Sequence, residues 1–320
     1  MIVVGSLTRE YFRKNHDIEL PADFRGIDNL WSVEDVKSAL KILNEKFIIM
    51  TTLAERVEIY INGTGTVTID WGDGSEIKEQ NFPFDLKTGK NVFQQKAYSD
   101  GDAHTIIIVG DISYLNCAYN QLTKLDVSQN DALEELCCEN NQLTILDVSK
   151  NAALINLMCN GNQIAELDVS QNTALKELWC QFNSLTSLDV SRNIALTELY
   201  CHFNKLTKLD VSNNIALEEL WCEYNQLTMM DISRNSKLKK LDCHKNQLTV
   251  LNVNHNQCML KFLICNNNLF TAAALDALFM SLPVSDGEVP IFNNPGTDDC
   301  DASIAENKGW EVIKKWKDEE

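Results

Sequence analysis

The chain has 320 residues, of which 44% are hydrophobic, and it carries a formal net charge of −18 with a sequence pI near 4.7. This apolar content excludes a mainly disordered protein, and the acidic balance argues against a nucleic-acid or anionic-membrane surface. No run of about 18 apolar residues is present, so we expect no membrane-spanning segment. The apolar start, residues 1–4, is shorter than the roughly 7–15-residue core of a signal peptide. We therefore expect either an intracellular protein or one whose leader lies outside this sequence.

Residues 1–50 are predicted to form an N-terminal extension with one helix, over residues 32–46. Ser32 and Asp35 have the spacing of a capping box. The apolar residues that follow fall on one helical face, and they are Val33, Val36, Leu40 and Leu43. We expect this helix to pack on the β-domain that comes next.

Residues 51–111 predict a small β-domain. Residues 56–61 and 66–71 alternate apolar and polar side chains as strands do, and the Asn-Gly-Thr-Gly segment between them predicts a hairpin. A third strand is expected at residues 104–109, running directly into the next region. Asp70, Asp73 and Asp102 suggest calcium, but a single Asp-Trp-Gly-Asp-Gly segment has too few ligands for a calcium loop, so we interpret them as turn residues.

A period of 21 residues dominates residues 112–270. Cysteine recurs at Cys117, Cys138, Cys159, Cys180, Cys201, Cys222 and Cys243, with an asparagine three residues after each. A second asparagine recurs at Asn130, Asn151, Asn172, Asn193, Asn214, Asn235 and Asn256. A fixed period of this length is typical of a solenoid of stacked coils.

Each coil contains two similar arms of the form L-x-x-L-x-(C/V)-x-x-N. In residues 133–151, Leu136 and Cys138 in one arm, and Leu146 and Val148 in the other, alternate with polar neighbours as in a strand buried on one side. The asparagine then ends the arm, where its amide can bond to turn backbone groups. Stacked coils are expected to form two parallel sheets with columns of leucine and of hydrogen-bonded asparagine.

The cysteine column is interpreted as structural, with small side chains buried in the core. The chain has no C-x-x-C. Cys201 and His202 are neighbours in an extended arm, as are Cys243 and His244, so each pair points to opposite faces and cannot ligate one ion. Metal or redox chemistry is the alternative. We predict no metal site and no cofactor.

The coil pattern L-x-x-L-x-C-x-x-N-x-L-T-x-L-D-V-S-x-N resembles the short bacterial leucine-rich repeat of Bacteroidetes surface proteins and of internalin-like proteins, over residues 112–270. Residues 69–74, IDWGDG, resemble the turn of a PKD-type β-sandwich, although the expected proline-containing segments are lacking. These resemblances imply a repeat solenoid behind a small β-sandwich-like domain, and a binding scaffold without catalytic residues. They also imply a cell-surface or secreted protein, whereas the free thiols are equally compatible with a location in the cytoplasm.

Residues 271–320 are predicted to be an α/β cap that closes the repeat array. Residues 271–282 read as a short amphipathic helix ended by Pro283, and a second helix is expected around residues 302–307. An open solenoid end exposes a sheet edge and an apolar core. We therefore assign this segment a structural role.

The predicted ligand-binding face lies on the cysteine arm, where outward positions vary between coils and recognition is commonly placed on a rigid scaffold. Three consecutive coils present six aromatic residues at two phases of the repeat, and these are Trp179, Phe182, Tyr200, Phe203, Trp221 and Tyr224. They are edged by Glu177, Glu198, Glu219 and Glu223, with His202 in the middle. Exposed aromatic patches of this size usually mark an interface.

Two interpretations of these aromatics stay open at this point. They can bind a ligand, or they can stack on one another and only stabilise neighbouring coils, as cross-strand pairs do. Aromatic anchors rimmed by glutamates suit a protein or peptide with basic groups, whereas aromatic platforms with polar edges also suit a glycan. The corresponding functions are a protein-binding module, a structural spacer of a cell-surface assembly and a glycan-binding adhesin. Self-association through this face is a further possibility.

The opposite arm carries aspartates in one phase, at Asp126, Asp147, Asp168, Asp189, Asp210 and Asp231. Like charges about 5 Å apart repel, so we expect compensation by local hydroxyls such as those of Thr123, Thr144 and Thr186, or by turn amides; a row of bound cations is the alternative. The five histidines have no neighbouring nucleophile in the sequence, and the chain has no phosphate-binding loop and no H-E-x-x-H. The sequence predicts no enzyme.

Overall fold

The computed structural model describes residues 37, 40–41, 44–73, 78–81, 91–253 and 259–315. The chain folds into two compact units, Met1–Ala153 and Leu154–Glu320. The division lies inside the predicted repeat region, and each unit is described by itself. Within the described residues no helix has the length and apolar character needed to cross a membrane.

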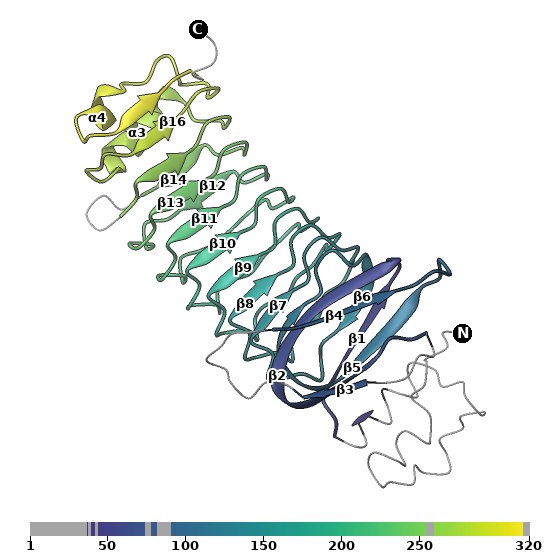
Figure 1. Ribbon diagram of the computed structural model, residues 1–320. Helices are drawn as coiled ribbons and strands as arrows, with labels where there is room; N and C mark the ends of the chain where they lie inside the picture. Colours follow the sequence, from purple (N-terminus) through teal and green to yellow (C-terminus); the bar gives the residue numbers. More distant parts are fainter. Residues whose placement is uncertain are drawn as a thin grey trace. The chain divides into compact units, whose positions relative to one another are not determined.

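Unit 1 is built on a β-sheet in which one long strand takes part in two kinds of pairing (Figure 1). Strand β5, His104–Asn116, pairs antiparallel with β1, Phe47–Thr52, and with β2, Arg56–Asp70. Its last residues pair in parallel with β7, Glu135–Cys137. The remaining strands are β3, Lys78–Asn81, and β4, Val92–Ala97, both antiparallel to β2, and β6, Leu122–Asp126, antiparallel to β1. The predicted third strand is therefore confirmed, and it does run into the first coil.

The hairpin predicted at residues 62–65 is wrong. Strand β2 continues through it for 15 residues. Its register against β5 shifts between Asn62 and Gly63 and again between Thr64 and Thr68. A Cβ atom on Gly63 would lie 2.0 Å from the carbonyl oxygen of Asp111. The glycine thus permits a close approach of two backbones at a bulge, which is the other use of glycine in a strand.

Only part of the predicted N-terminal helix lies within the described residues. Lys37, Leu40 and Lys41 are helical, and Leu40 is fully buried. The rest of residues 32–43 lies outside them.

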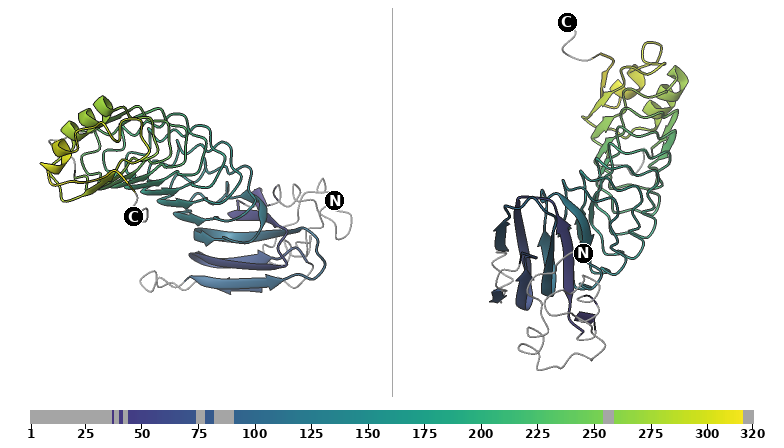
Figure 2. Two further views of the ribbon diagram at one scale, coloured as in Figure 1. Left: turned by 90° about the horizontal axis from the view of Figure 1, so that it is seen from above. Right: turned by 90° about the vertical axis from the view of Figure 1, so that its right-hand side faces the viewer.

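Unit 2 contains a ladder of short parallel strands, one per coil (Figure 1). They are β8, Asn156–Met158; β9, Glu177–Trp179; β10, Glu198–Tyr200; β11, Glu219–Trp221; β13, Lys240–Asp242; and β15, Phe262–Ile264. The register places equivalent residues side by side, as in Leu178, Leu199 and Leu220. The coils stack one on the next (Figure 2), as the 21-residue period predicts.

The core of unit 2 consists of the predicted leucine and cysteine columns. Leu199, Cys201, Leu220 and Cys222 have no exposed surface. All ten described cysteines are free thiols. Burial raises the pKa of the Cys201 thiol far above its ordinary value, so this thiol stays protonated and unreactive. These observations agree with the structural interpretation of the column.

The asparagine after each cysteine links two coils by hydrogen bonds. The Asn204 side-chain amide donates to the carbonyl oxygens of Cys201, at 3.1 Å, and of Cys180 in the preceding coil, at 3.0 Å. Its Oδ1 accepts from the Leu185 amide at 2.9 Å. The same bonds recur at Asn225 and Asn246. The predicted column of hydrogen-bonded asparagine is thus present.

The valine arms form less sheet than expected. Among the described residues of unit 2, only β12, Met229–Asp231, and β14, Val250–Asn252, pair as strands on this side. In the preceding coils the arms are joined by single amide bonds, such as Ser184 to the Ile164 carbonyl at 2.9 Å and Lys205 to the Leu185 carbonyl at 2.8 Å. The second asparagine column bonds these coils instead, since the Asn193 amide donates to the carbonyls of Val169 and Asn172.

The C-terminal segment has the predicted helices and continues the repeat. It contains α3, Ala272–Ser281; β16, Glu288–Pro290; α4, Ser303–Glu306; and β17, Glu311–Ile313. Strand β16 pairs in parallel with β15, and β17 with β16. Asn294 takes the place of a coil asparagine, because its amide donates to the carbonyls of Ile291 and Cys265 and its Oδ1 accepts from the Phe270 amide.

Candidate functional site

The candidate site is the outer face of β9, β10 and β11, where the three coils carry aromatic side chains in two columns. We call this surface the aromatic face. The residues of its first column come immediately before the cysteines and those of the second two residues after them. The first column is Trp179, Tyr200 and Trp221, and the second is Phe182, Phe203 and Tyr224.

The first column is half-buried and its rings contact one another along the ladder. The centroids of Trp179 and Tyr200 are 5.0 Å apart, and those of Tyr200 and Trp221 are 6.0 Å apart in an edge-on arrangement. The Tyr200 hydroxyl donates to Glu219 Oε2 at 3.2 Å, and the Trp221 indole N–H donates to the same oxygen at 3.3 Å. Neighbouring coils are therefore tied together by rings and by one shared carboxylate.

The second column is more exposed and has an unusual backbone. Phe182, Phe203 and Tyr224 all have positive φ, at 54°, 50° and 52°. Their rings stack nearly parallel, with centroids 4.5 Å apart for Phe182 and Phe203 and 4.0 Å for Phe203 and Tyr224. The side chain of Phe182 is 51% exposed and that of Phe203 is 37% exposed.

The left-handed backbone at these three residues carries an energetic cost. The equivalent position has positive φ in every coil, and the other coils hold Tyr119, Asn140, Gly161, Lys245 and Asn267 there. Glycine and asparagine are the residues that tolerate this conformation best. An aromatic residue there costs roughly 1–2 kcal/mol. Aromatic stacking returns only about 0.5–1.5 kcal/mol per pair. Stability alone therefore gives little reason for phenylalanine or tyrosine at these positions.

A row of polar side chains lies between the two aromatic columns, at the position directly after each cysteine. We call Gln181, His202, Glu223 and His244 the polar row. The His202 ring meets Phe182 and Phe203 edge-on, with centroids 5.4 Å and 5.8 Å away. The sequence analysis placed His202 and Glu223 at this face but missed Gln181 and His244. The signal that identifies these two is their phase in the repeat.

Three members of the polar row have buried atoms without a hydrogen-bond partner among the described residues. These atoms are Gln181 Oε1, His202 Nδ1 and Glu223 Oε2. Gln181 is 9% exposed and Glu223 is 7% exposed. His202 Nδ1 lies 3.6 Å from the other oxygen of Glu223, beyond hydrogen-bond distance. An unpaired buried polar group costs about 1–3 kcal/mol, so this row is poorly satisfied by the chain itself.

Burial shifts the protonation of the polar row toward neutral forms. Burial lowers the pKa of His202 to about 4, with the nearby His244 lowering it further and Asp242 opposing it. Burial raises the pKa of Glu223 to about 7, with the Asp242 carboxylate acting in the same direction and His244 opposing it. The His244 ring bonds Asp242 at 2.6 Å. At neutral pH His202 is therefore uncharged and offers Nδ1 as an acceptor or donor according to its tautomer.

The predicted glutamate rim is present as one column of the ladder. The register places Glu177, Glu198 and Glu219 side by side, followed by Lys240. Glu219 pairs with Lys240 at 2.8 Å. Burial raises the pKa of Glu198, and the carboxylates of Glu177 and Glu219 raise it further. The structure thus brings together every residue predicted for the site.

The aspartate column of the opposite arm is compensated by turn amides. Asp168, Asp189 and Asp210 each accept from the backbone N–H of the serine two residues later, at 2.8–2.9 Å. The Ser191 hydroxyl and the Ser191 backbone N–H lower the pKa of Asp189. The Thr123 hydroxyl, which was expected to donate to an aspartate of this column, donates to the Thr51 carbonyl instead.

The aspartates of the β-domain form turns and ion pairs. Asp70 Oδ1 accepts from the Gly72 amide at 2.9 Å, and Gly72 has φ of 74°. Asp73 pairs with Lys96. The Asp102 amide donates to Asp100. Across the described part of the chain, no group of three or more metal-ligating side chains could hold a metal ion.

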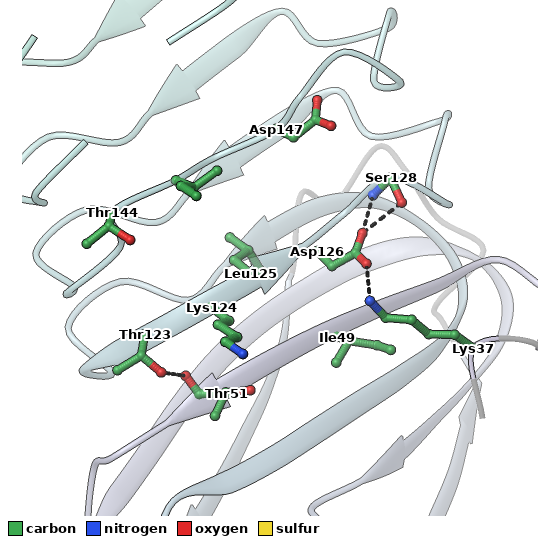
Figure 3. Close-up of a pocket in the computed structure, with 11 residues that line it drawn as sticks. Lys37, Ile49, Thr51, Thr123, Lys124, Leu125, Asp126, Ser128, Thr144 and Asp147 are labelled. Atoms are coloured by element: carbon green, nitrogen blue, oxygen red, sulfur yellow. Dashed lines mark hydrogen bonds and ion pairs between the residues drawn. The ribbon is translucent and has the colours of Figure 1, made fainter. Parts of the chain in front are cut away.

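Unit 1 also has a pocket of about 560 Å³ beside β6 (Figure 3). Its charged groups face one another, since Lys37 pairs with Asp126 at 2.8 Å and the Ser128 amide and hydroxyl donate to the same carboxylate. The other labelled lining residues include Ile49, Thr144 and Asp147. Lys37, Asp126 and Ser128 therefore satisfy one another, and Thr123 bonds to Thr51. We do not assign the functional site to this pocket.

Comparison with known proteins relates this fold to leucine-rich-repeat structures. The leucine-rich-repeat domain of APL1B is 18% identical, with a TM-score of 0.55, and the match covers 63% of this chain and 64% of that one. The functional domain of InlJ from Listeria monocytogenes, which includes a cysteine ladder, is 30% identical over 63% of this chain and 53% of its own length, with a TM-score of 0.48. The leucine-rich-repeat protein LIC12759 from Leptospira interrogans is 20% identical over 62% of this chain and 59% of its own, with a TM-score of 0.46.

The chain thus spans between about half and two thirds of the length of these solved structures. No protein-family model matches the sequence, and no curated protein matches it. The fold is a leucine-rich-repeat solenoid.

Proposed function

We propose that the protein is a non-catalytic binding module that recognises a protein or peptide partner through the aromatic face. The observation that carries this proposal is the second aromatic column. Phe182 and Phe203 are exposed and Tyr224 is half-buried, and all three stand on a left-handed backbone that disfavours aromatic side chains. Residues kept at an energetic cost on a rigid scaffold are commonly functional.

The chemistry of the face favours a partner with basic groups. Glu177 and Glu198 lie beside exposed or half-exposed rings and are not ion-paired within the described residues. Aromatic faces and carboxylates both attract cations. Tryptophan and tyrosine are also the residues enriched among binding hot spots. Leucine-rich-repeat neighbours support a protein-interaction role in general.

A structural spacer is the second candidate, because the rings do contact one another. Every aromatic residue of the face has a ring neighbour within 6.0 Å. In that case the columns would stabilise the coils and bind nothing.

The remaining assignments rest on sequence resemblance. We propose that the module is exported and works at the cell surface, that its repeats belong to the Cys-containing Bacteroidetes type and that its β-domain is PKD-like. Unit 1 supports the last point only as far as its antiparallel sheet of β1 to β6.

The proposal is tested by placing a photo-crosslinking amino acid at position 182 and, as a control, at position 194. Phe182 belongs to the aromatic face, whereas Ile194 is 61% exposed outside it. We expect a discrete crosslinked protein from extracellular-matrix and cell-surface extracts at position 182 and none at position 194. Equal capture at both positions, or capture at position 194 alone, would contradict recognition by this face.

A further inference from the structure

Unit 1 has a further pocket, of about 300 Å³, between strand β2 and the turn that follows β5. Its lining from β2 consists of Arg56, Glu58 and Tyr60, which alternate along the strand and therefore point to one side of the sheet. Tyr119 lines the pocket from the turn. The Asn120 side chain holds this turn against β2, because its Oδ1 accepts from the Glu58 amide at 2.8 Å and its Nδ2 donates to the Glu58 carbonyl at 2.7 Å. The two walls of the pocket are therefore fixed relative to each other.

The pocket is open because the first coil has a short side chain where later coils have longer ones. Ala118 comes directly after Cys117, at the position of the polar row. In unit 2 the same position holds Gln181, His202 and Glu223, whose side chains fill the space between the two aromatic columns. The methyl group of Ala118 is too short to fill the equivalent space in the first coil.

Tyr119 is exposed at this pocket at an energetic cost. Its backbone is left-handed, with φ of 59°, and its side chain is 72% exposed. Within the described residues no other aromatic ring contacts it, and the next two coils hold Asn140 and Gly161 at its position. The cost of about 1–2 kcal/mol for this backbone is therefore not offset by stacking. Residues kept under such strain are commonly functional.

A second ring and two charged groups border the same pocket and are accessible. Tyr60 is 41% exposed, and its ring packs against Phe93 with centroids 4.9 Å apart. Arg56 Nη2 lies 2.8 Å from Glu58 Oε1, and these two side chains are 63% and 45% exposed. A ligand in the pocket can therefore reach an aromatic face, a guanidinium group and a carboxylate without any movement of the chain.

The charges of the pocket offset one another. Arg56 and Glu58 form an ion pair, and burial raises the pKa of Glu139, which also lines the pocket, toward its neutral form. The pocket thus has no excess of one charge that would select an ion. It offers both donors and acceptors, which suits a neutral ligand that has hydroxyl groups, because a hydroxyl both donates and accepts.

We propose that this pocket binds a neutral pyranose sugar, with one face of the sugar ring against Tyr119 and its hydroxyl groups bonded to Arg56 and Glu58. The C–H groups on one face of a pyranose form a flat apolar surface, and they pack favourably on the electron-rich face of an aromatic ring. A volume of about 300 Å³ is at the lower end of the range for small-molecule pockets, so it suits a single sugar residue. This site shares no residue with the aromatic face and does not rest on the proposed function.

The first experiment titrates the protein with neutral sugars and follows binding by saturation-transfer NMR. The probes are methyl β-glucopyranoside, methyl β-galactopyranoside, methyl α-mannopyranoside and N-acetylglucosamine. Sorbitol is the control, because it has the hydroxyl groups of a sugar without a ring. We expect at least one pyranose to bind at millimolar concentration, about 10-fold or more tightly than sorbitol. Failure of all four sugars to bind, or equal binding of sorbitol, would overturn the proposal.

Variants locate the bound sugar. Tyr119→Asn removes the ring but keeps a residue that tolerates the left-handed backbone, as Asn140 does in the next coil, so it should bind about 10-fold more weakly and melt no lower than the wild type. Ala118→Gln fills the pocket as Gln181 fills its own coil and should abolish binding. Ile145→Ala is the control, because Ile145 is 77% exposed and does not line this pocket. Unchanged affinity in both Tyr119→Asn and Ala118→Gln would overturn the proposed site.

A cationic side chain is the competing occupant, because rings and carboxylates also attract cations. The Arg56 guanidinium at the pocket opposes a second cation. N-acetyl-lysine-methylamide is therefore titrated in the same way and is expected not to bind. If it binds to the wild type and not to Tyr119→Asn, while the four sugars bind to neither, the pocket holds a basic peptide and the sugar proposal fails.

Discussion

At the scale of single residues, the asparagine after each cysteine is the main polar support of the coils. Asn204 satisfies two carbonyl groups and one amide that belong to two coils. Each of these backbone groups is buried in a turn, where water is a poor substitute. The Asn204 side chain therefore contributes more to the free energy of unfolding than its own burial suggests.

Asn204→Ala is expected to lower the free energy of unfolding by about 2–4 kcal/mol, because it leaves buried backbone groups unpaired. The matched control is Asn213→Ala, since Asn213 makes one exposed bond to the Ser191 carbonyl, and we expect a change within about 0.5 kcal/mol. Urea unfolding followed by circular dichroism measures both. Equal effects would show that the asparagine column does not stabilise the coils as described.

Phe203, an aromatic residue with left-handed backbone, allows the effects of one side chain on binding and on stability to be measured separately. Phe203→Asn should relieve about 1–2 kcal/mol of backbone strain and lose about 0.5–1.5 kcal/mol per stacked pair. We therefore expect a melting temperature close to that of the wild type together with loss of partner binding. Phe203→Ala keeps the strain and should melt lower than Phe203→Asn. The reverse order would contradict strain at this residue.

His202 and Glu223 should affect the pH dependence of stability in opposite directions. Burial lowers the pKa of His202 from 6.5 to about 4, so the unfolded chain binds the extra proton and this histidine makes stability rise with pH between those values. Burial raises the pKa of Glu223 from 4.5 to about 7, so the folded chain binds the extra proton and stability falls as pH rises through that range.

The wild type should consequently show little pH dependence from this pair between about pH 4.5 and pH 6.5. His202→Gln should leave a fall in the free energy of unfolding as pH rises from about 4.5 to 7, and Glu223→Gln should leave a rise from about 4 to 6.5. Urea unfolding at several pH values measures the slopes. Two variants with the wild-type profile would show that the pair is not buried as described.

At the scale of elements, strand β2 shows that pairing with another strand can override a turn signal in the local sequence. The segment at residues 62–65 has the residues of a turn, yet β2 continues because β5 pairs with it on both sides of the bulge. Pairing between strands that are distant in the sequence cannot be read from the residues of one strand. The coils could be predicted because equivalent residues recur every 21 residues.

Gly63→Ala should be strongly destabilising, because the added Cβ would lie 2.0 Å from the Asp111 carbonyl oxygen. We expect a loss of about 3 kcal/mol or more, in the range of severe backbone conflicts. Gly65→Ala is the control, since open space surrounds that position although its φ is 72°, and it should cost only about 1 kcal/mol. Thermal unfolding compares the two. A milder effect at position 63 than at position 65 would contradict the bulge.

The candidate site could be predicted only in part. The phase of the repeat identified the aromatics and the glutamate rim, because side chains at one phase share one face. His202 and Glu223 of the polar row were identified in the same way, whereas Gln181 and His244 were missed. The burial of this row, which leaves its atoms unpaired, depends on the packing of side chains from several coils and has no local signal in the sequence. The positive φ at Phe182 is not evident from the residue itself, since phenylalanine rarely adopts it.

At the scale of the whole molecule, the chain combines an antiparallel sheet in unit 1 with stacked coils in unit 2. The aspartates of the repeat turns are bonded to local amides, and the buried thiols of the core are unreactive. The features of unit 2 that the scaffold itself does not require are concentrated on the aromatic face. Recognition by that face is therefore the central claim.

The most direct test compares the wild type with the triple variant Phe182→Asn/Phe203→Asn/Tyr224→Asn, measuring melting temperature and the binding of the partner captured at position 182. Ile194→Ala/Ile215→Ala serves as the control, because both isoleucines are exposed outside the face. We predict that the triple variant loses binding and melts only a few degrees lower, and that the control keeps both. A large fall in melting temperature, in a protein for which the wild type captures no partner, would contradict recognition and identify the aromatics as supports of the coils.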